Sequence, residues 1–249
     1  MSKAKEIDNW REFDVCEALC NSLVANKFKE PTTVQKESLV YLNAHTDMVI
    51  AAKTGQGKTL TFGIPILDLL LRRLSKFGHE DDEFDSVKAL IMAPTRELTI
   101  QIKEHIEAIV PSQNAKQIKV CAIVGGMSIQ KQLRLLSYKP TIIVATPGRL
   151  WELMSDHNND YLNKGLPLID VLVLDEADRM IADGHFKEMR DILAHIYTSR
   201  VSIKRPKKEG DDKVEEVKLS EQYKECVELG DEFFVSKHST RPDIDLSKV

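Results

Sequence analysis

The sequence predicts an α/β fold with a mostly parallel β-sheet and helices on both of its faces. Amphipathic segments such as residues 95–110, with apolar residues at helical spacing, separate short apolar segments that have the composition of buried strands. Strands that alternate with helices are typical of a parallel sheet, in which ligands bind beyond the carboxyl ends of the strands. The predicted strands, each expected to be buried on both faces, are residues 48–52, 87–93, 119–124, 141–145 and 169–174.

Composition and charge narrow the class of protein. The 249-residue chain is 42% apolar and 30% charged, as expected of a soluble globular domain. Its net charge of −4 excludes a uniformly basic nucleic-acid binder but allows a local basic face. We find neither a leader pattern nor an apolar run of about 18 residues, so we expect no secretion and no membrane partner. The four cysteines lack zinc-site spacing, and we expect reduced core thiols.

The stretch AAKTGQGKT, at residues 51–59, predicts a phosphate-binding loop between a strand and a helix. It matches the P-loop pattern except that Ala52 replaces the first glycine. Gly55 and Gly57 let the backbone N–H groups turn inward, Lys58 would reach the β- and γ-phosphates, and the Thr59 hydroxyl would bind Mg²⁺. The alternative is a glycine turn followed by a surface lysine. The nucleotide-binding residues expected from this loop are Ala52, Lys53, Thr54, Gly55, Gln56, Gly57, Lys58 and Thr59.

A second acidic site is predicted where the strand at 169–174 ends in Asp175, Glu176, Ala177 and Asp178. Asp175 would hold Mg²⁺, directly or through water, and Glu176 would orient or deprotonate the attacking water. Asp178 would position this loop by hydrogen bonds. The alternative is that these acids only cap the next helix. The catalytic residues expected are therefore Lys58, Asp175 and Glu176, with Thr59 and Asp175 as the metal ligands.

These motifs resemble those of the DEAD-box RNA helicases, in the same order along the chain. FKEPTTVQ (28–35), PTREL (94–98), GG (125–126), TPGR (146–149) and DEAD (175–178) accompany the phosphate loop. Residues 10–197 are thus similar to the first, N-terminal RecA-like domain of a DEAD-box ATP-dependent RNA helicase. The segment DRMIADGHF is also similar to the branch that acts in large-subunit ribosome assembly.

The resemblance implies ATP and Mg²⁺ as cofactors and an adenine reader upstream of the sheet. Gln35, in the motif that begins at Phe28, carries an amide that can pair with the N6 amino group and N7 of adenine. A plain surface glutamine is the alternative. Neither Asn26-Lys27 nor Asn163-Lys164 continues into a guanine-reading motif.

The resemblance also implies RNA as the partner, bound through its backbone and therefore largely independently of sequence. Ordinary helix capping is the alternative for each site taken alone. Pre-ribosomal particles are the partner implied by the ribosome-assembly branch, and the oligomeric state stays open. The residues implied in RNA contact are Pro94, Thr95, Arg96, Gly125, Gly126, Thr146, Pro147, Gly148 and Arg149.

The chain departs from the family pattern after the acidic site. It contains no Ser-Ala-Thr motif and no second RecA-like domain with its arginines, so we expect slow hydrolysis by this chain alone. We expect a Q-motif region at 1–46 that packs on the core, a RecA-like domain at 47–199, and a charged, irregular tail at 200–249 without a further buried strand.

The sequence leaves three hypotheses for the function and two for the cellular location. The leading hypothesis is the ATP- and RNA-binding half of a helicase. The alternatives are a truncated, non-catalytic module that binds RNA or a partner, and a P-loop ATPase that acts on protein or DNA. The basic run at 204–208 matches a nuclear-import signal and equally a solvated lysine run. It favours a nuclear or nucleolar location, with the cytoplasm as the alternative.

Overall fold

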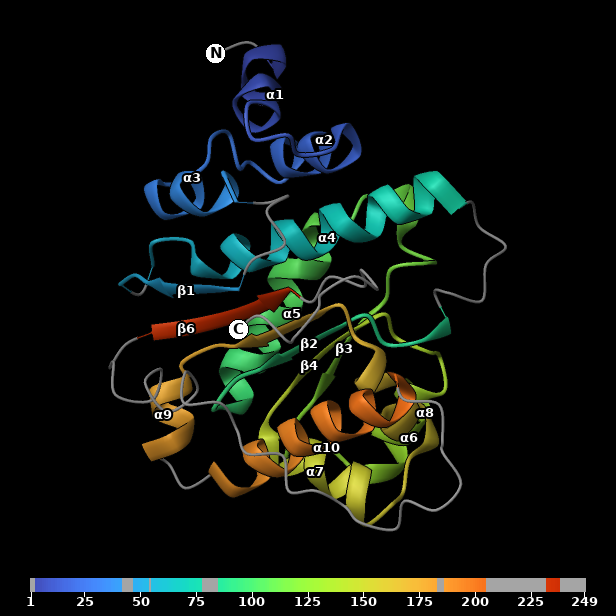
Figure 1. The fold of residues 1–249 in the computed structure, drawn as a ribbon. Helices are drawn as coiled ribbons and strands as arrows, with labels where there is room; N and C mark the ends of the chain where they lie inside the picture. Colours follow the sequence, from blue (N-terminus) through green and yellow to red (C-terminus); the bar gives the residue numbers. More distant parts are fainter. Residues whose placement is uncertain are drawn as a thin grey trace.

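A six-stranded sheet forms the centre of the molecule (Figure 1). A computed structural model describes residues 3–41, 47–53, 55–77, 85–182, 186–204 and 232–237. The strand order is β1-β6-β5-β2-β4-β3; β5, β2, β4 and β3 pair in parallel, and β6 runs antiparallel to β1 and β5. The predicted mostly parallel sheet is confirmed. Its strands are β1 (Met48–Ala51), β2 (Ala89–Met92), β3 (Val120–Ile123), β4 (Ile142–Ala145), β5 (Val171–Leu174) and β6 (Glu232–Lys237).

Helices cover both faces of the sheet. The buried cluster on one face includes side chains from α1 (Lys3–Arg11), α2 (Glu17–Ala25), α3 (Thr33–Leu39), α4 (Lys58–Phe77) and α5 (Arg96–Ile109). The cluster on the other face draws on α6 (Ile129–Leu136), α7 (Pro147–Ser155), α8 (Asp160–Gly165), η3 (Leu166–Leu168), α9 (Ala177–Ala182) and α10 (Phe186–Lys204). A short 3₁₀ turn, η2 (Ser112–Asn114), connects α5 to β3.

The central strands contribute alternate residues to the two clusters. In β2, Ala89 and Ile91 face α4 and α5, whereas Leu90 and Met92 belong to the opposite cluster. β2, β4 and β5 are buried along their whole length, as predicted. The prediction of burial on both faces is wrong for β1, where Val49 is 46% exposed. β1 is the end strand of the sheet, and Ile50 is its one buried residue.

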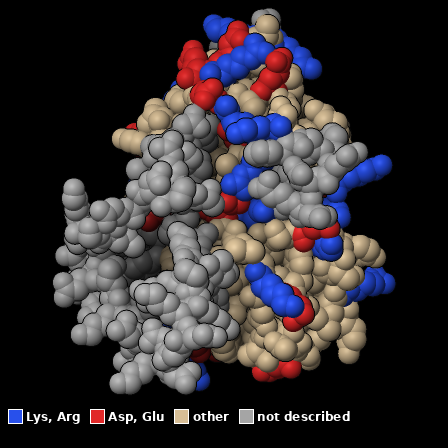
Figure 2. Space-filling view, turned by 45° about the vertical axis from the view of Figure 1, so that its right-hand side comes forward, with Lys and Arg blue, Asp and Glu red and all other residues tan. Residues whose placement is uncertain are grey.

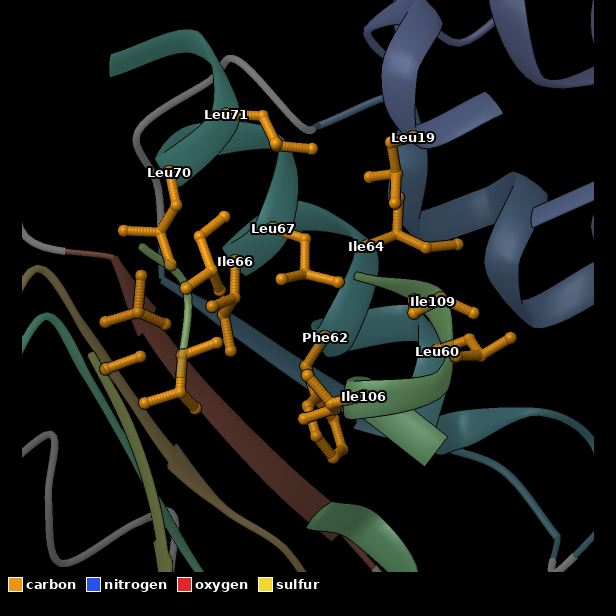
Figure 3. Packing of buried hydrophobic residues seen from close by; sticks show 14 of the residues in the cluster. Leu19, Leu60, Phe62, Ile64, Ile66, Leu67, Leu70, Leu71, Ile106 and Ile109 are labelled. Carbon is orange, nitrogen blue, oxygen red and sulfur yellow. The ribbon is translucent and has the colours of Figure 1, made fainter. Parts of the chain in front are cut away.

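Helix α4 is the most enclosed helix of the described fold. Figure 3 shows its apolar side chains in one cluster with Leu19 of α2 and with Ile106 and Ile109 of α5. Ile64 and Leu67 are fully buried there. Because both the sheet and the N-terminal helices pack on α4, the position of its first residues is determined by contacts along its whole length.

Polar contacts join the N-terminal helices to the same core. The amide of Cys16 donates to Oδ1 of the buried Asp68 on α4 at 2.7 Å, and Arg72 Nε donates to Oδ2 of Asp68 at 2.7 Å. Farther along, Asn26 Nδ2 donates to the carbonyl of Ala108 on α5 at 2.8 Å. Residues 3–41 therefore contact α4 and α5 through both apolar and polar groups.

The C-terminal segment differs from its prediction in two places. α10 continues to Lys204, and β6 occupies residues 232–237 between β1 and β5, so the predicted irregular tail is wrong for these residues. The remainder of 200–249 lies outside the described residues. The apolar part of EFFVSK is short and stands among charges, which is a weak local signal. A strand between two partners bonds along both of its edges, and such pairing outweighs weak local preference.

On the face shown in Figure 2, the charged side chains are unevenly distributed. Figure 2 shows acidic and basic side chains intermingled over the N-terminal helices at the top, and a mostly uncharged surface on the described part below. Of the acidic stretch HEDDEFD at residues 79–85, only Asp85 lies in the described part, where it pairs with Lys139. No described helix has the length and apolar content to cross a membrane.

The described cysteines are free thiols, as predicted. Burial raises the pKa of Cys16 to about 12 and those of Cys20 and Cys121 to about 11. At neutral pH all three are therefore protonated and suited to packing rather than to nucleophilic chemistry. Cys226 lies outside the described residues.

We predict that Asp170→Asn destabilises the fold. Arg73 of α4 binds Asp170, just before β5, with two hydrogen bonds of 2.6 and 2.8 Å, and Asp170 is 5% exposed. Removing the charge of Asp170 breaks this two-bond ion pair beside the core, so the free energy of unfolding in urea should fall by about 3 kcal/mol. The matched control is Glu107→Gln, which breaks the exposed Lys103–Glu107 pair and should cost about 0.5 kcal/mol or less. Equal losses in the two variants would contradict the prediction.

Candidate functional site

The loops that carry the predicted motifs lie at one edge of the sheet. β1 and β5 are both antiparallel to β6 and so run in the same direction, which β2, β4 and β3 share. The carboxyl ends of these five strands therefore meet at one edge. The strand order divides that edge in two. The phosphate loop and the acidic site follow β1 and β5, and the three other motifs follow β2, β3 and β4.

The phosphate loop has the backbone conformation that its glycines allow. Gly55 and Gly57 have φ of 83° and 91°, in the left-handed region that favours glycine. A Cβ on Gly57 would lie 2.5 Å from Gln35 Nε2, whereas one on Gly55 would meet nothing within 4 Å. The loop closes on itself because the amide of Lys53 donates to Gln56 Oε1 at 3.1 Å. A side chain at Gly57 would separate the loop from α3.

The other described residues of this loop lie between β1 and the first turn of α4. Ala52 is partly buried directly after β1, and Lys53 and Gln56 are exposed. Lys58 and Thr59 are the first two residues of α4, and both are partly buried. The partial positive charge of a helix N-terminus therefore adds to the charge of Lys58. Thr54 lies outside the described residues.

Gln35 connects α3 to the phosphate loop. It is 3% exposed; its Oε1 accepts from the amide of Thr32 at 2.9 Å and its Nε2 donates to the carbonyl of Gly57 at 3.0 Å. Thr32 Oγ1 donates to the carbonyl of Gln56 at 2.9 Å. One N–H and one lone pair of the Gln35 amide are unused by these bonds. Phe28 is 37% exposed, and its carbonyl accepts from Trp10 Nε1 at 2.9 Å.

Sequence reasoning missed the role of Thr32. The Thr-x-x-Gln spacing from Thr32 to Gln35 is the capping-box signature, which predicts the contact between the two residues at the start of α3. Nothing local predicts the bond from Thr32 to Gln56, because those residues are 24 positions apart.

Asp175 is the most strongly perturbed carboxyl group of the site. It is 4% exposed, and burial raises its pKa from 3.8 to about 6, against the nearby charge of Lys58, which lowers the pKa, while Glu176 raises it. Its Oδ1 is buried and has no hydrogen-bond partner in the described structure. A buried carboxylate oxygen without a partner destabilises the fold unless a ligand satisfies it. The charge of Lys58 lowers the pKa of Asp175, so the lysine of the phosphate loop acts electrostatically on this carboxyl group.

Glu176 and Asp178 follow at the start of α9. Glu176 has φ of 52°, a left-handed conformation that is uncommon for a non-glycine residue and recurs at functional sites. Its side chain is paired with Arg179 at 3.5 Å. Asp178 lies in the first turn of α9 and is partly buried. The backbone at Glu176 thus turns sharply directly after the buried Asp175.

Two of the other motifs contact each other. Thr95 caps α5 by accepting from the amide of Leu98 at 3.2 Å, directly after the buried Pro94. Arg96 reaches from α5 to the next loop, where its Nη1 donates to the carbonyl of Gly125 at 3.2 Å. Gly126 has φ of 76°, and a Cβ there would collide with Arg96.

The fourth motif starts α7. The amide of Thr146 donates to the carbonyl of Ile123 at 3.0 Å, and Pro147 is the first residue of the helix. Gly148 is partly buried. The side chain of Arg149 is 15% exposed; its Nε pairs with Glu152 at 3.1 Å, and its Nη1 is buried without a partner in the described structure. Pro147 thus takes the first helical position as the capping alternative predicts, but the Thr146 side chain makes no capping hydrogen bond, and Arg149 keeps an unsatisfied donor.

The donor set fits Mg²⁺ together with a nucleotide. Asp175 and Thr59 offer hard oxygen ligands, and Mg²⁺ usually takes one or two protein ligands and completes its shell with water and phosphate oxygens. In the described residues, no group of three His, Cys, Asp or Glu side chains could hold a metal alone. The unpartnered Oδ1 of Asp175 supports a ligand at this position.

Fold and site together define a P-loop nucleotide-binding domain of the RecA type: a mostly parallel sheet with a glycine loop and a buried acid at the ends of two strands. The sequence profile of the DEAD/DEAH box helicases matches residues 32–209, and the chain belongs to this family.

Among the relatives, the chain is 43% identical over 191 residues to "ATP-dependent RNA helicase mak5" of Sclerotinia sclerotiorum, covering 76% of this chain and 24% of that protein. It is 42% identical over 199 residues to "DEAD-box ATP-dependent RNA helicase 13" of Oryza sativa, covering 76% and 23%. It also resembles the solved structure of the DEAD-box helicase Mss116 bound to ssRNA and UDP-BeF, with a TM-score of 0.66 and 30% identity over 78% of this chain and 37% of that one. The chain spans about a quarter of the length of the curated relatives that it matches.

We predict that Asp175→Asn stabilises the metal-free protein at neutral pH. The folded pKa of about 6 lies above the ordinary 3.8, so the folded state binds more protons than the unfolded state between these values. Stability is therefore lost as the pH rises through this window, and the cost is complete above pH 6. In urea unfolding with a chelator, the variant should exceed the wild type by about 2 kcal/mol near pH 7.5 and match it near pH 4. A difference that does not change with pH would contradict this.

Proposed function

We propose that this chain is the ATP- and RNA-binding half of an ATP-dependent RNA helicase. The observation that carries the proposal is the buried, unpartnered Oδ1 of Asp175, which lies within the influence of the Lys58 charge at the edge where the phosphate loop begins α4. Such a pair of elements is what a magnesium-bound triphosphate requires.

Each residue of the nucleotide half has a distinct role in this proposal. Lys58 binds the β- and γ-phosphates, and Thr59 and Asp175 hold Mg²⁺. Glu176 orients or deprotonates the water that attacks the γ-phosphate, and Asp178 positions this loop. When bound, Mg²⁺ neutralises charge that develops on the transferring phosphoryl group.

The loop and the upstream motif complete the nucleotide site. Gln35 reads adenine with the N–H and the lone pair that its bonds to Gly57 and Thr32 leave unused. Phe28, exposed at the start of the same motif, would contact the adenine base. The inward-turned loop binds phosphate oxygens through Ala52, Lys53, Thr54, Gly55, Gln56 and Gly57.

The RNA half would bind the sugar-phosphate backbone. Helix starts, glycine turns and guanidinium groups suit phosphate oxygens and 2′-hydroxyls, so the contact would be largely independent of sequence. Arg149, with its buried unpartnered Nη1, offers a donor to such an oxygen. The residues proposed for RNA contact are Pro94, Thr95, Arg96, Gly125, Gly126, Thr146, Pro147, Gly148 and Arg149.

The partners and location follow from the same resemblance. The segment DRMIADGHF supports pre-ribosomal particles as partners and a nuclear or nucleolar location. In the family, two RecA-like domains close on ATP and RNA together, so unwinding by this chain would need a second such domain.

The second candidate function is a non-catalytic module that binds RNA or a partner without turnover. It is favoured by β6, which is the described strand that follows the acidic tetrad. This strand reads EFFVSK and runs antiparallel between β1 and β5. In the family, the strand after the acidic tetrad carries Ser-Ala-Thr, which this sequence does not contain.

We predict that Lys58→Ala weakens ATP binding about 10- to 100-fold, because a charged hydrogen bond contributes roughly 1.5–3 kcal/mol. Fluorescence titration with a labelled ATP analogue in the presence of Mg²⁺ measures it. The control is Lys116→Ala, which removes an exposed lysine from the turn before β3, at the opposite edge of the sheet. Unchanged affinity in Lys58→Ala would refute the site assignment.

We predict that adding the second RecA-like domain of a DEAD-box relative in trans raises RNA-stimulated ATP hydrolysis. Arginines that stabilise the transferring phosphate are worth about 10³- to 10⁵-fold in rate, and this gain should appear in part at saturating domain concentration. The same mixture made with Lys58→Ala should stay at background. Hydrolysis that does not respond, together with RNA affinity that is the same with and without ATP, would favour the non-catalytic module.

A further inference from the structure

The glycine turn after β3 accepts hydrogen bonds from a buried side chain that lies outside the sequence motifs described above. Gln132 of α6 is fully buried, and its Nε2 donates to the carbonyl of Val124 at 2.9 Å and to that of Met127 at 3.1 Å. These two carbonyls flank Gly125 and Gly126. One planar amide therefore ties both ends of the turn to α6.

Three backbone carbonyls of this turn accept hydrogen bonds from protein side chains, whereas its backbone amides have no acceptor among the described residues. Gln132 takes the carbonyls of Val124 and Met127, and Arg96 takes that of Gly125. Among the described residues, none accepts a hydrogen bond from the amides of Gly125, Gly126 or Met127. Successive backbone N–H groups in a glycine turn suit an anion.

We propose that Gln132 is a positioning residue for RNA binding: by fixing the carbonyls of the turn, it presents the amides of Gly125, Gly126 and Met127 to a phosphate of the RNA backbone. This inference rests on the proposed RNA-binding function. It extends that function to a buried residue on α6 that does not touch the RNA itself.

The chemistry of Gln132 matches positioning better than simple packing. Its Oε1 is buried and has no partner in the described structure, so the side chain carries an unsatisfied acceptor in the core. An apolar residue of the same shape would avoid that acceptor. The neutral amide nitrogen of Gln132 carries two N–H donors and can hold both carbonyls at once, which an apolar side chain or a hydroxyl group cannot do.

The test is Gln132→Met, with Gln130→Met as the matched control. Gln130 lies on the same helix but is exposed. Fluorescence anisotropy of a labelled single-stranded oligouridine, titrated with the whole chain at several salt concentrations, measures the affinity. Gln132→Met should weaken binding about tenfold and make the salt dependence shallower by the equivalent of about one phosphate contact. The affinity for a labelled ATP analogue should change less than about twofold.

A second pair of variants keeps the inference testable if Gln132→Met folds poorly. Gln132→Glu keeps the shape but has no N–H donor, and Gln130→Glu adds the same charge on the exposed face. Gln132→Glu should lose more RNA affinity than Gln130→Glu. Wild-type RNA affinity and salt slope in both Gln132 variants would overturn the inference. So would equal losses of RNA and ATP-analogue binding, which mark a general structural defect. A wild-type chain that binds no RNA would instead overturn the proposed function.

Discussion

A buried carboxyl group at the carboxyl end of β5 is the constraint around which this domain is arranged. Asp175 is 4% exposed and lacks a partner for Oδ1, and its pKa stays raised although the charge of Lys58 and a backbone hydrogen bond at Glu176 both lower it. The fold tolerates this because α4 is buried along most of its length and β5 is central in the sheet. Stability elsewhere in the core thus offsets a local cost at the site.

The phosphate loop depends on a helix that precedes the sheet. Gln35 and Thr32 contact the carbonyls of Gly57 and Gln56, and a side chain at Gly57 would push α3 away. The N-terminal helices are anchored in turn on α4 through Asp68. A substitution in the N-terminal helices can therefore alter the position of the phosphate loop through α3, which contacts the loop, or through α4, which begins at the loop.

The strand order separates two kinds of chemistry along one edge. The β1 and β5 side carries groups suited to a triphosphate and a cation. The β2, β4 and β3 side carries helix starts, a glycine turn and guanidinium groups suited to a polyanionic backbone. Contacts such as that of Arg96 with Gly125 connect neighbouring loops within the second group. This layout agrees with membership of the DEAD/DEAH box helicases.

The sequence by itself determined the five parallel strands, the helices between them and the order of the motifs, because these depend on local periodicity and on residues such as Gly55 and Gly57 that only certain turns accept. Only the tertiary structure decided that β1 is exposed on one face and that β6 pairs between β1 and β5. It also decided that Gln35 bonds to the phosphate loop and that Gln132 holds the glycine turn. These features join groups whose distance along the chain hides them from any local pattern, since pairing and burial are set by partners that only folding brings near.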